Sequence, residues 1–189
     1  FDKLRLNPHM EVIRWDEAYG KVAGIEVNHL HPILSNVLVR RALMYAINST
    51  EMVELAWGKA RKVATSCVAD FITRWYNPEV AKICPYPYDP AKAEALLDQA
   101  GYPRGPNGVR FELELYSDGT SRGDTIRNEY LAAKWTAVGV KTTSKIADVA
   151  TIQKKYADCD PLAPFGAASQ GAGPDPDVLY AYYHSEVGT

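Results

Sequence analysis

A strand, a long helix and a second strand are predicted in succession between residues 109 and 146, and this order limits the fold more than any other feature. Apolar and polar side chains alternate strictly over residues 109–116. One face of this segment carries the apolar side chains Val109, Phe111, Leu113 and Leu115. Residues 124–138 then carry apolar side chains at helical spacing, Gly139 ends this helix, and residues 140–146 read as another strand. Strands that alternate with helices predict an α/β layered domain with a partly parallel sheet.

Three more helices are predicted on the N-terminal side of this unit. The first includes Val39, Ala42 and Leu43 on one face, with Ser35 or Asn36 placed to cap its start. The second runs from about residue 50 to residue 57. The third begins at residues 89–90, where Asp can cap the helix and Pro suits the first helical position, and it stops at residue 101, a glycine. Residues 58–88 show no period and contain three prolines, so we expect an extended segment there.

The rest of the chain gives shorter signals. We expect a strand over residues 10–15, a short helix over residues 149–156 and a strand over residues 162–167. The sequence SQGAG at residues 169–173 predicts a glycine-rich turn, followed by a last helix capped by Asp175. Residues 1–189 are expected to form a single domain, because 189 residues suit one domain with a sizeable core.

Charge and cysteine content exclude some functions. The net charge is -2 and there is no block of basic residues, so a nucleic acid is not expected as a partner. No apolar run approaches the roughly 18 residues needed to cross a bilayer. The three cysteines, Cys67, Cys84 and Cys159, show no metal-ligand spacing. Cys67 and Cys84 could pair in an oxidising compartment, or all three could remain thiols.

Catalytic and metal-binding motifs are missing from the sequence. It contains no nucleophile elbow, no zinc-binding H-E-x-x-H and no phosphate-binding Walker loop, so we expect neither an enzyme nor a cofactor. His29 and His31 would share one side of a strand, but no further ligand lies nearby, and we expect surface or cleft histidines and no metal. The 12 tyrosines and four tryptophans suit reversible binding of a polar solute, or a tyrosine-rich core.

Four motifs carry a resemblance to a known family. They are VRRALMYAINSTEMVELAWG (39–58), YPYDPAKAEALLDQAGYP (86–103), TAVGVKT (136–142) and FGAASQGAGPDPDVLYAYYHS (165–185). In this order they resemble motifs of the family 5 solute-binding proteins, which include the dipeptide-, oligopeptide- and nickel-binding proteins. The resemblance covers about residues 22–185, and the first two motifs are the most specific.

The resemblance implies a fold and a function. The fold would be a lobe like those of the type II periplasmic binding proteins, with a mixed sheet flanked by helices. Residues 1–189 would be the C-terminal ligand-binding lobe of a two-lobe protein, without its N-terminal lobe. That protein would capture a small solute, such as a peptide-like molecule, an opine or a sugar, and deliver it to an ABC permease. It would be periplasmic or extracytoplasmic, and anchored to the cell surface in a Gram-positive organism. The alternative is an interaction or sensory module of the same fold, with a protein partner.

The resemblance also indicates which residues would face the cleft between the lobes. We expect these to be Asn28, Tyr116, Ser117, Ser169, Gln170 and Gly171, although several of them could serve only to shape turns. Peptide-binding relatives have an aspartate that pairs with the ligand's α-amine near the end of the glycine-rich turn, where this chain has Gly171 or Ala172. Without that charged partner a free α-amine is disfavoured, unless another acid takes the role.

Overall fold

The computed structural model describes residues 22–23, 25, 27, 29–58, 62–64, 68, 70, 73–83, 86–157 and 169–170. Several predictions lie outside these residues. They are the strands expected at residues 10–15 and 162–167, the last helix, the three cysteines, Asn28 and Gly171.

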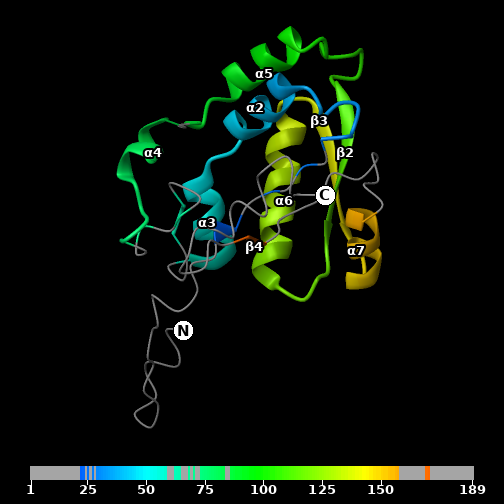
Figure 1. The fold of residues 1–189 in the computed structure, drawn as a ribbon. Coiled ribbons are helices and arrows are strands. Elements are labelled where there is room, and N and C mark those ends of the chain that lie inside the picture. Colours follow the sequence, from blue (N-terminus) through cyan, green and yellow to red (C-terminus); the bar gives the residue numbers. More distant parts are fainter. Residues whose placement is uncertain are drawn as a thin grey trace.

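The centre of the fold is a β-α-β unit made of β2 (Phe111–Ser117), α6 (Arg122–Ala137) and β3 (Val140–Ile146). The two strands are parallel over their whole length, as predicted. Figure 1 shows α6 lying along them. Only two residues separate α6 from β3, and the second, Gly139, has a φ of 92°, a conformation that glycine adopts without strain.

Three helices with capped N-termini surround this unit: α2 (Val37–Tyr45), α3 (Ser49–Trp57) and α5 (Pro90–Gln99). Their caps are Asn36, Asn48 and Asp89, whose side chains accept hydrogen bonds from backbone N–H groups of the first turn. Helix α2 packs against α5, and α3 packs against α6 (Figure 1). The predictions for these three helices are confirmed.

One hydrophobic core joins α2, α5, α6 and the two parallel strands. Leu34, Val39, Leu97, Leu115, Leu131 and Val140 are completely inaccessible to solvent. Helix α7 (Val149–Ala157) contributes to a smaller cluster, in which Ala147 and Ile152 pack on Tyr116. Helices therefore contribute to both faces of β2, as an α/β layered fold requires.

Two local predictions are wrong. Residues 78–83 form a short helix, α4 (Pro78–Ile83), inside the segment expected to be extended. The Asn77 side chain accepts the Glu79 N–H at 3.0 Å, and Pro78 stands at the first helical position, where it favours a helix. Ser169 and Gln170 form β4 (Ser169–Gln170), antiparallel to β1 (Val22–Ala23), where a turn was expected. A partner strand distant in sequence overrides the local glycine signal there.

The amino end of β2 is fixed by a buried arginine. The Arg110 side chain, 2% exposed, donates to the carbonyl oxygens of Val138 at 3.0 Å and Tyr102 at 2.6 Å. It also forms ion pairs with Glu94 and Asp98 of α5.

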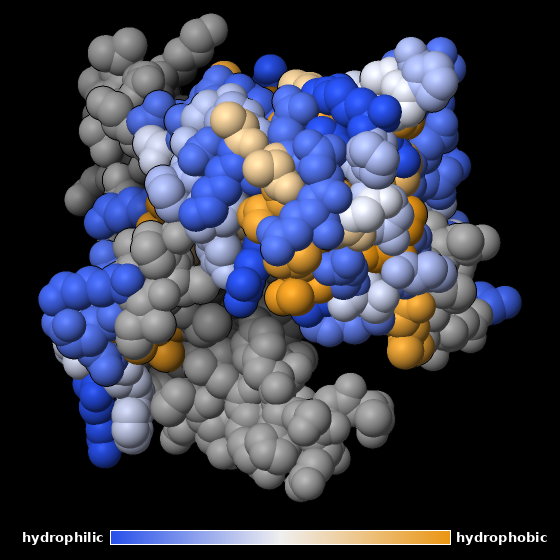
Figure 2. All heavy atoms as spheres, turned by 90° about the horizontal axis from the view of Figure 1, so that it is seen from above, coloured by the Kyte–Doolittle hydropathy of each residue, from blue (hydrophilic) through white to orange (hydrophobic). Residues whose placement is uncertain are grey.

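Viewed from the side of α2 and α5, the surface is mostly polar, with a small group of apolar side chains within it (Figure 2).

Candidate functional site

The carboxyl ends of β2 and β3 lie at the same edge of the sheet, because the strands are parallel and in register from Phe111–Val140 to Ser117–Ile146. Helix α6 begins at this edge, five residues after Ser117. Ligands of open α/β sheets bind beside the carboxyl ends of the strands, near helix N-termini. We therefore call residues 117–124, with Trp57 beside them, the candidate edge.

Ser117 is the most unusual residue of this edge. By strand alternation its side chain shares the face of Leu115, which packs in the core with α6. Ser117 is only 8% exposed, and its hydroxyl has no hydrogen-bond partner in the part of the chain that the structure describes. Buried hydroxyl groups are normally paired, so an unpaired one points to strain or to a group that completes the site.

Tyr116 faces the opposite side of β2. Its ring lies in the small cluster with Ile152, and its hydroxyl donates to Glu114 at 2.7 Å. The pKa of the Glu114 carboxyl is lowered, first by the Lys145 ammonium and then by this tyrosine. The ammonium group of Lys155 lies 5.2 Å from the centre of the Tyr116 ring. The structure therefore does not bring the Tyr116 and Ser117 side chains together.

The other expected site residues are located only in part. Ser169 and Gln170 stand in β4, opposite Ala23 and Val22 of β1, and only their backbone is described. Asn28 and Gly171 lie outside the described residues. Their predicted role at the cleft stays a prediction.

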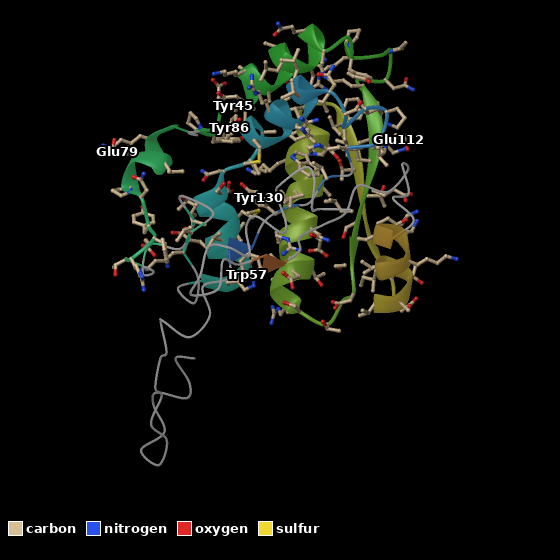
Figure 3. All side chains as sticks on the ribbon, viewed as in Figure 1. Tyr45, Trp57, Glu79, Tyr86, Glu112 and Tyr130 are labelled. Carbon is tan, nitrogen blue, oxygen red and sulfur yellow. The ribbon has the colours of Figure 1, made fainter. Side chains whose placement is uncertain are left out.

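A tryptophan that the sequence analysis did not single out packs on the first turn of α6. A Cβ atom built on Gly123 would lie 2.6 Å from Cδ1 and 2.8 Å from Cε2 of Trp57, so only glycine fits there. Figure 3 shows Trp57 at the end of α3, beside the lower part of α6. A glycine inside the first turn of a long helix is the one sequence signal that could have indicated this contact.

Behind this contact lie two buried polar residues of α6. The guanidinium carbon of Arg127 is 5.8 Å from the centre of the Trp57 ring, and Arg127 is 5% exposed. It forms an ion pair with Asp124 at 2.5 Å and donates twice to Asn128 Oδ1, at 3.2 and 3.1 Å. Asn128, fully buried, donates from Nδ2 to the Tyr116 carbonyl oxygen at 3.2 Å.

Two exposed aspartates follow the strands at this edge. Asp118 accepts hydrogen bonds from the N–H and hydroxyl of Thr120, and Asp148 accepts the same pair from Thr151. Hydrogen bonds from the Thr120 N–H and hydroxyl lower the pKa of Asp118, and those from the Thr151 hydroxyl and N–H lower that of Asp148. Both side chains are therefore ionised at neutral pH, and they make the loops after β2 and β3 negative.

His31, one of the two histidines singled out from the sequence, has a structural role. His31 is 6% exposed, and its Nδ1 accepts the N–H groups of Ile33 at 3.2 Å and Leu34 at 3.4 Å, which fixes the turn before α2. Among the residues that the structure describes, no three His, Cys, Asp or Glu side chains are grouped to hold a metal ion. None of the helices it describes is long and apolar enough to cross a membrane.

The whole chain, residues 1–189, matches the family model described as bacterial extracellular solute-binding proteins, family 5, middle. The chain is 30% identical over 179 residues to heme-binding protein A of Haemophilus influenzae, covering 92% of this chain and 30% of that protein. It is 40% identical over 93 residues to the glutathione-binding protein GsiB of Shigella flexneri, covering 49% of this chain and 16% of that protein.

A solved structure has the same fold. It is the ABC transporter-associated periplasmic binding protein DppA from Helicobacter pylori, in complex with peptide STSA. The TM-score is 0.71 at 21% identity, and the match covers 95% of this chain and 32% of that chain. The β-α-β unit and its helices are thus those of a lobe of type II periplasmic binding proteins. The chain belongs to the family 5 bacterial extracellular solute-binding proteins. It spans about a third or less of the length of each of these three proteins.

Proposed function

We propose that this chain is the C-terminal lobe of a two-lobe protein that captures a small solute and delivers it to an ABC permease in the membrane. The observation that carries the proposal is the family match along all 189 residues. In this account the protein is extracytoplasmic or periplasmic, binds no nucleic acid and is not an enzyme. Solute binding would shift the protein toward the closed arrangement of its lobes, which the permease recognises.

The solute is proposed to be peptide-like, and glutathione is the first to test. The support is the similarity to the glutathione-binding protein GsiB, at 40% identity over 93 residues. Heme is the second candidate, because the similarity to heme-binding protein A extends over 92% of this chain.

The edge offers groups that suit a peptide-like solute. The α-amine of such a solute needs an acid, and the usual position is occupied by Gly171 or Ala172. Asp118 and Asp148 stay ionised at neutral pH and supply negative charge in the loops beside the strands. The Ser117 hydroxyl, which has no hydrogen-bond partner among the described residues, is a donor and an acceptor at the start of this loop. Asn28, Tyr116, Ser169, Gln170 and Gly171 remain proposed cleft residues.

Isothermal titration of the full-length protein with glutathione, and in parallel a spectroscopic titration with heme, tests this function. We expect micromolar or tighter binding of one of the two, and no binding of either would overturn the proposed solutes. Residues 1–189 alone should bind much more weakly, because a pocket normally encloses ~70–90% of a small ligand and one lobe supplies only part of it. Equal affinity of the lobe and the full-length protein would overturn the two-lobe account.

A further inference from the structure

A continuous line of contacts runs from the half-buried Trp57 at the end of α3, across two buried residues of α6, to the end of β2. It begins with the Trp57 ring, continues through the guanidinium of Arg127 and the amide of Asn128, and ends at the Tyr116 carbonyl. That carbonyl belongs to the peptide group that joins Tyr116 to Ser117. The line therefore ends at the peptide group before Ser117, whose hydroxyl has no hydrogen-bond partner among the described residues.

The chemistry of this line fixes its geometry. A guanidinium only donates hydrogen bonds, so the oxygen of Asn128 must face Arg127 and its NH₂ group must face the Tyr116 carbonyl. Asn128 is fully buried, so water does not compete for these bonds. The charge of Arg127 is balanced by Asp124 in the first turn of α6. One arginine thus connects the start of α6 to the end of β2.

We propose that Arg127 and Asn128 are positioning residues, which hold the segment 117–121 in its solute-binding conformation, with the Trp57 ring as their support. This inference rests on the proposed function of the candidate edge. Neither residue has to touch the solute. They act by keeping the Tyr116–Ser117 peptide and the first turn of α6 in a fixed relation, which preserves affinity because a preorganised site loses less entropy on binding.

The decisive variant is Asn128→Asp in the full-length protein. A carboxylate keeps the shape of the side chain and still accepts from Arg127, but it presents an oxygen instead of an N–H to the Tyr116 carbonyl. Arg110→Lys is the matched control, because the Arg110 side chain is also buried, at 2% exposed, and also donates to backbone carbonyls, but at the opposite end of β2. Arg127→Lys, which keeps the charge near Asp124, is a milder variant should Asn128→Asp fail to fold.

Two measurements separate positioning from mere stability. Amide hydrogen exchange at residues 117–121 in the ligand-free protein should rise about tenfold in Asn128→Asp and stay unchanged in Arg110→Lys, although both variants unfold at a lower temperature. The dissociation constant for glutathione should also rise about tenfold in Asn128→Asp alone. Unchanged exchange and unchanged affinity in Asn128→Asp would overturn the positioning role and leave the proposed function intact. Absence of glutathione binding by the wild type would count against the proposed solute, and the exchange measurement would still decide the positioning role.

Discussion

The indole ring of Trp57 lies directly against the α-carbon of Gly123, with no room for a side chain between them. Trp57 is the last residue of α3, and Gly123 is the second residue of α6. The contact therefore sets how closely the two helices approach at the candidate edge.

Gly123→Ala should destabilise the protein, because the added methyl group overlaps the Trp57 ring and the helices must separate. Overpacking of this kind costs about 1–3 kcal/mol. Urea unfolding of the single variant measures the loss, and the double variant Gly123→Ala, Trp57→Ala is its control. Compared with Trp57→Ala alone, the double variant should be about equally stable or more stable, since alanine is a better helix former than glycine. A Gly123→Ala variant as stable as the wild type would contradict the close contact.

Ser117→Ala should stabilise the ligand-free protein by about 1 kcal/mol, because it removes a buried hydroxyl that has no partner among the described residues. Ser121→Ala is the matched comparison four residues away. Its hydroxyl caps α6 by accepting the Asp124 N–H at 3.3 Å, so its loss should cost about 1 kcal/mol. The two serine variants should thus shift the unfolding midpoint in opposite directions. The affinity of Ser117→Ala for glutathione should fall. If the variant were instead less stable than the wild type and bound glutathione equally well, the hydroxyl would stabilise the fold and not bind the solute.

The sequence predicted those elements whose signals are local. The alternation in β2, the helical period of α6 and the caps Asn36 and Asp89 depend on residues close together in the chain, and the structure bears them out. The short strand β4 could not be predicted in this way, because it exists only through its pairing with β1, whose residues lie 146 and 148 positions earlier.

The candidate edge was predicted only in part for a similar reason. Ser117 was expected at the edge from the family resemblance and from its place at the end of a strand, both of which can be read from the sequence alone. The contact of Trp57 with Gly123 depends on how α3 packs against α6, and no pattern within either helix encodes it. Arginine in an alternating strand indicates a solvent-facing position, yet Arg110 is buried because Glu94 and Asp98 of α5 meet it.

Removing charge from the loops after β2 and β3 should weaken binding of a solute that carries an amine. Asp118→Asn and Asp148→Asn keep an oxygen that accepts from Thr120 and Thr151, so the loop geometry should persist. We expect the dissociation constant for glutathione to rise in at least one variant, with a smaller difference from the wild type at high salt. Asp70→Asn, on a surface-exposed residue outside this edge, is the control. Unchanged affinity in both variants would exclude these aspartates as partners of the amine.

Tyr130→Phe should reduce stability more at neutral pH than in acid. Tyr130, whose pKa is raised by burial, donates to Glu51 at 2.6 Å, and this bond together with Lys134 lowers the pKa of Glu51 below 4.5. A carboxyl with a lowered folded-state pKa adds stability above its unfolded pKa, and loses it as the pH falls through the folded value. The difference between wild type and Tyr130→Phe should therefore shrink below pH 4.5.

Urea unfolding at neutral pH and at about pH 3 measures this change. Glu51→Gln is the control, because it removes the titrating group. In that background Tyr130→Phe should show the same effect at both pH values. A difference between wild type and Tyr130→Phe that is independent of pH would mean that the bond to Glu51 does not lower its pKa.

Two arginines that share Glu94 should differ widely in their contribution to stability. Each arginine donates to two backbone carbonyls, but the Arg110 side chain is 2% exposed, whereas that of Arg104 is 36% exposed. Arg110→Met should cost about 3 kcal/mol, since it leaves buried carbonyl oxygens unpaired. Arg104→Met should cost no more than about 1 kcal/mol, because its ion pair and its hydrogen bonds are exposed to water, which can take their place. Both losses are measured by urea unfolding, and added salt should reduce only the smaller one. Equal losses of stability in the two variants would mean that Arg110 stabilises the protein through Glu94 and not through the backbone carbonyls.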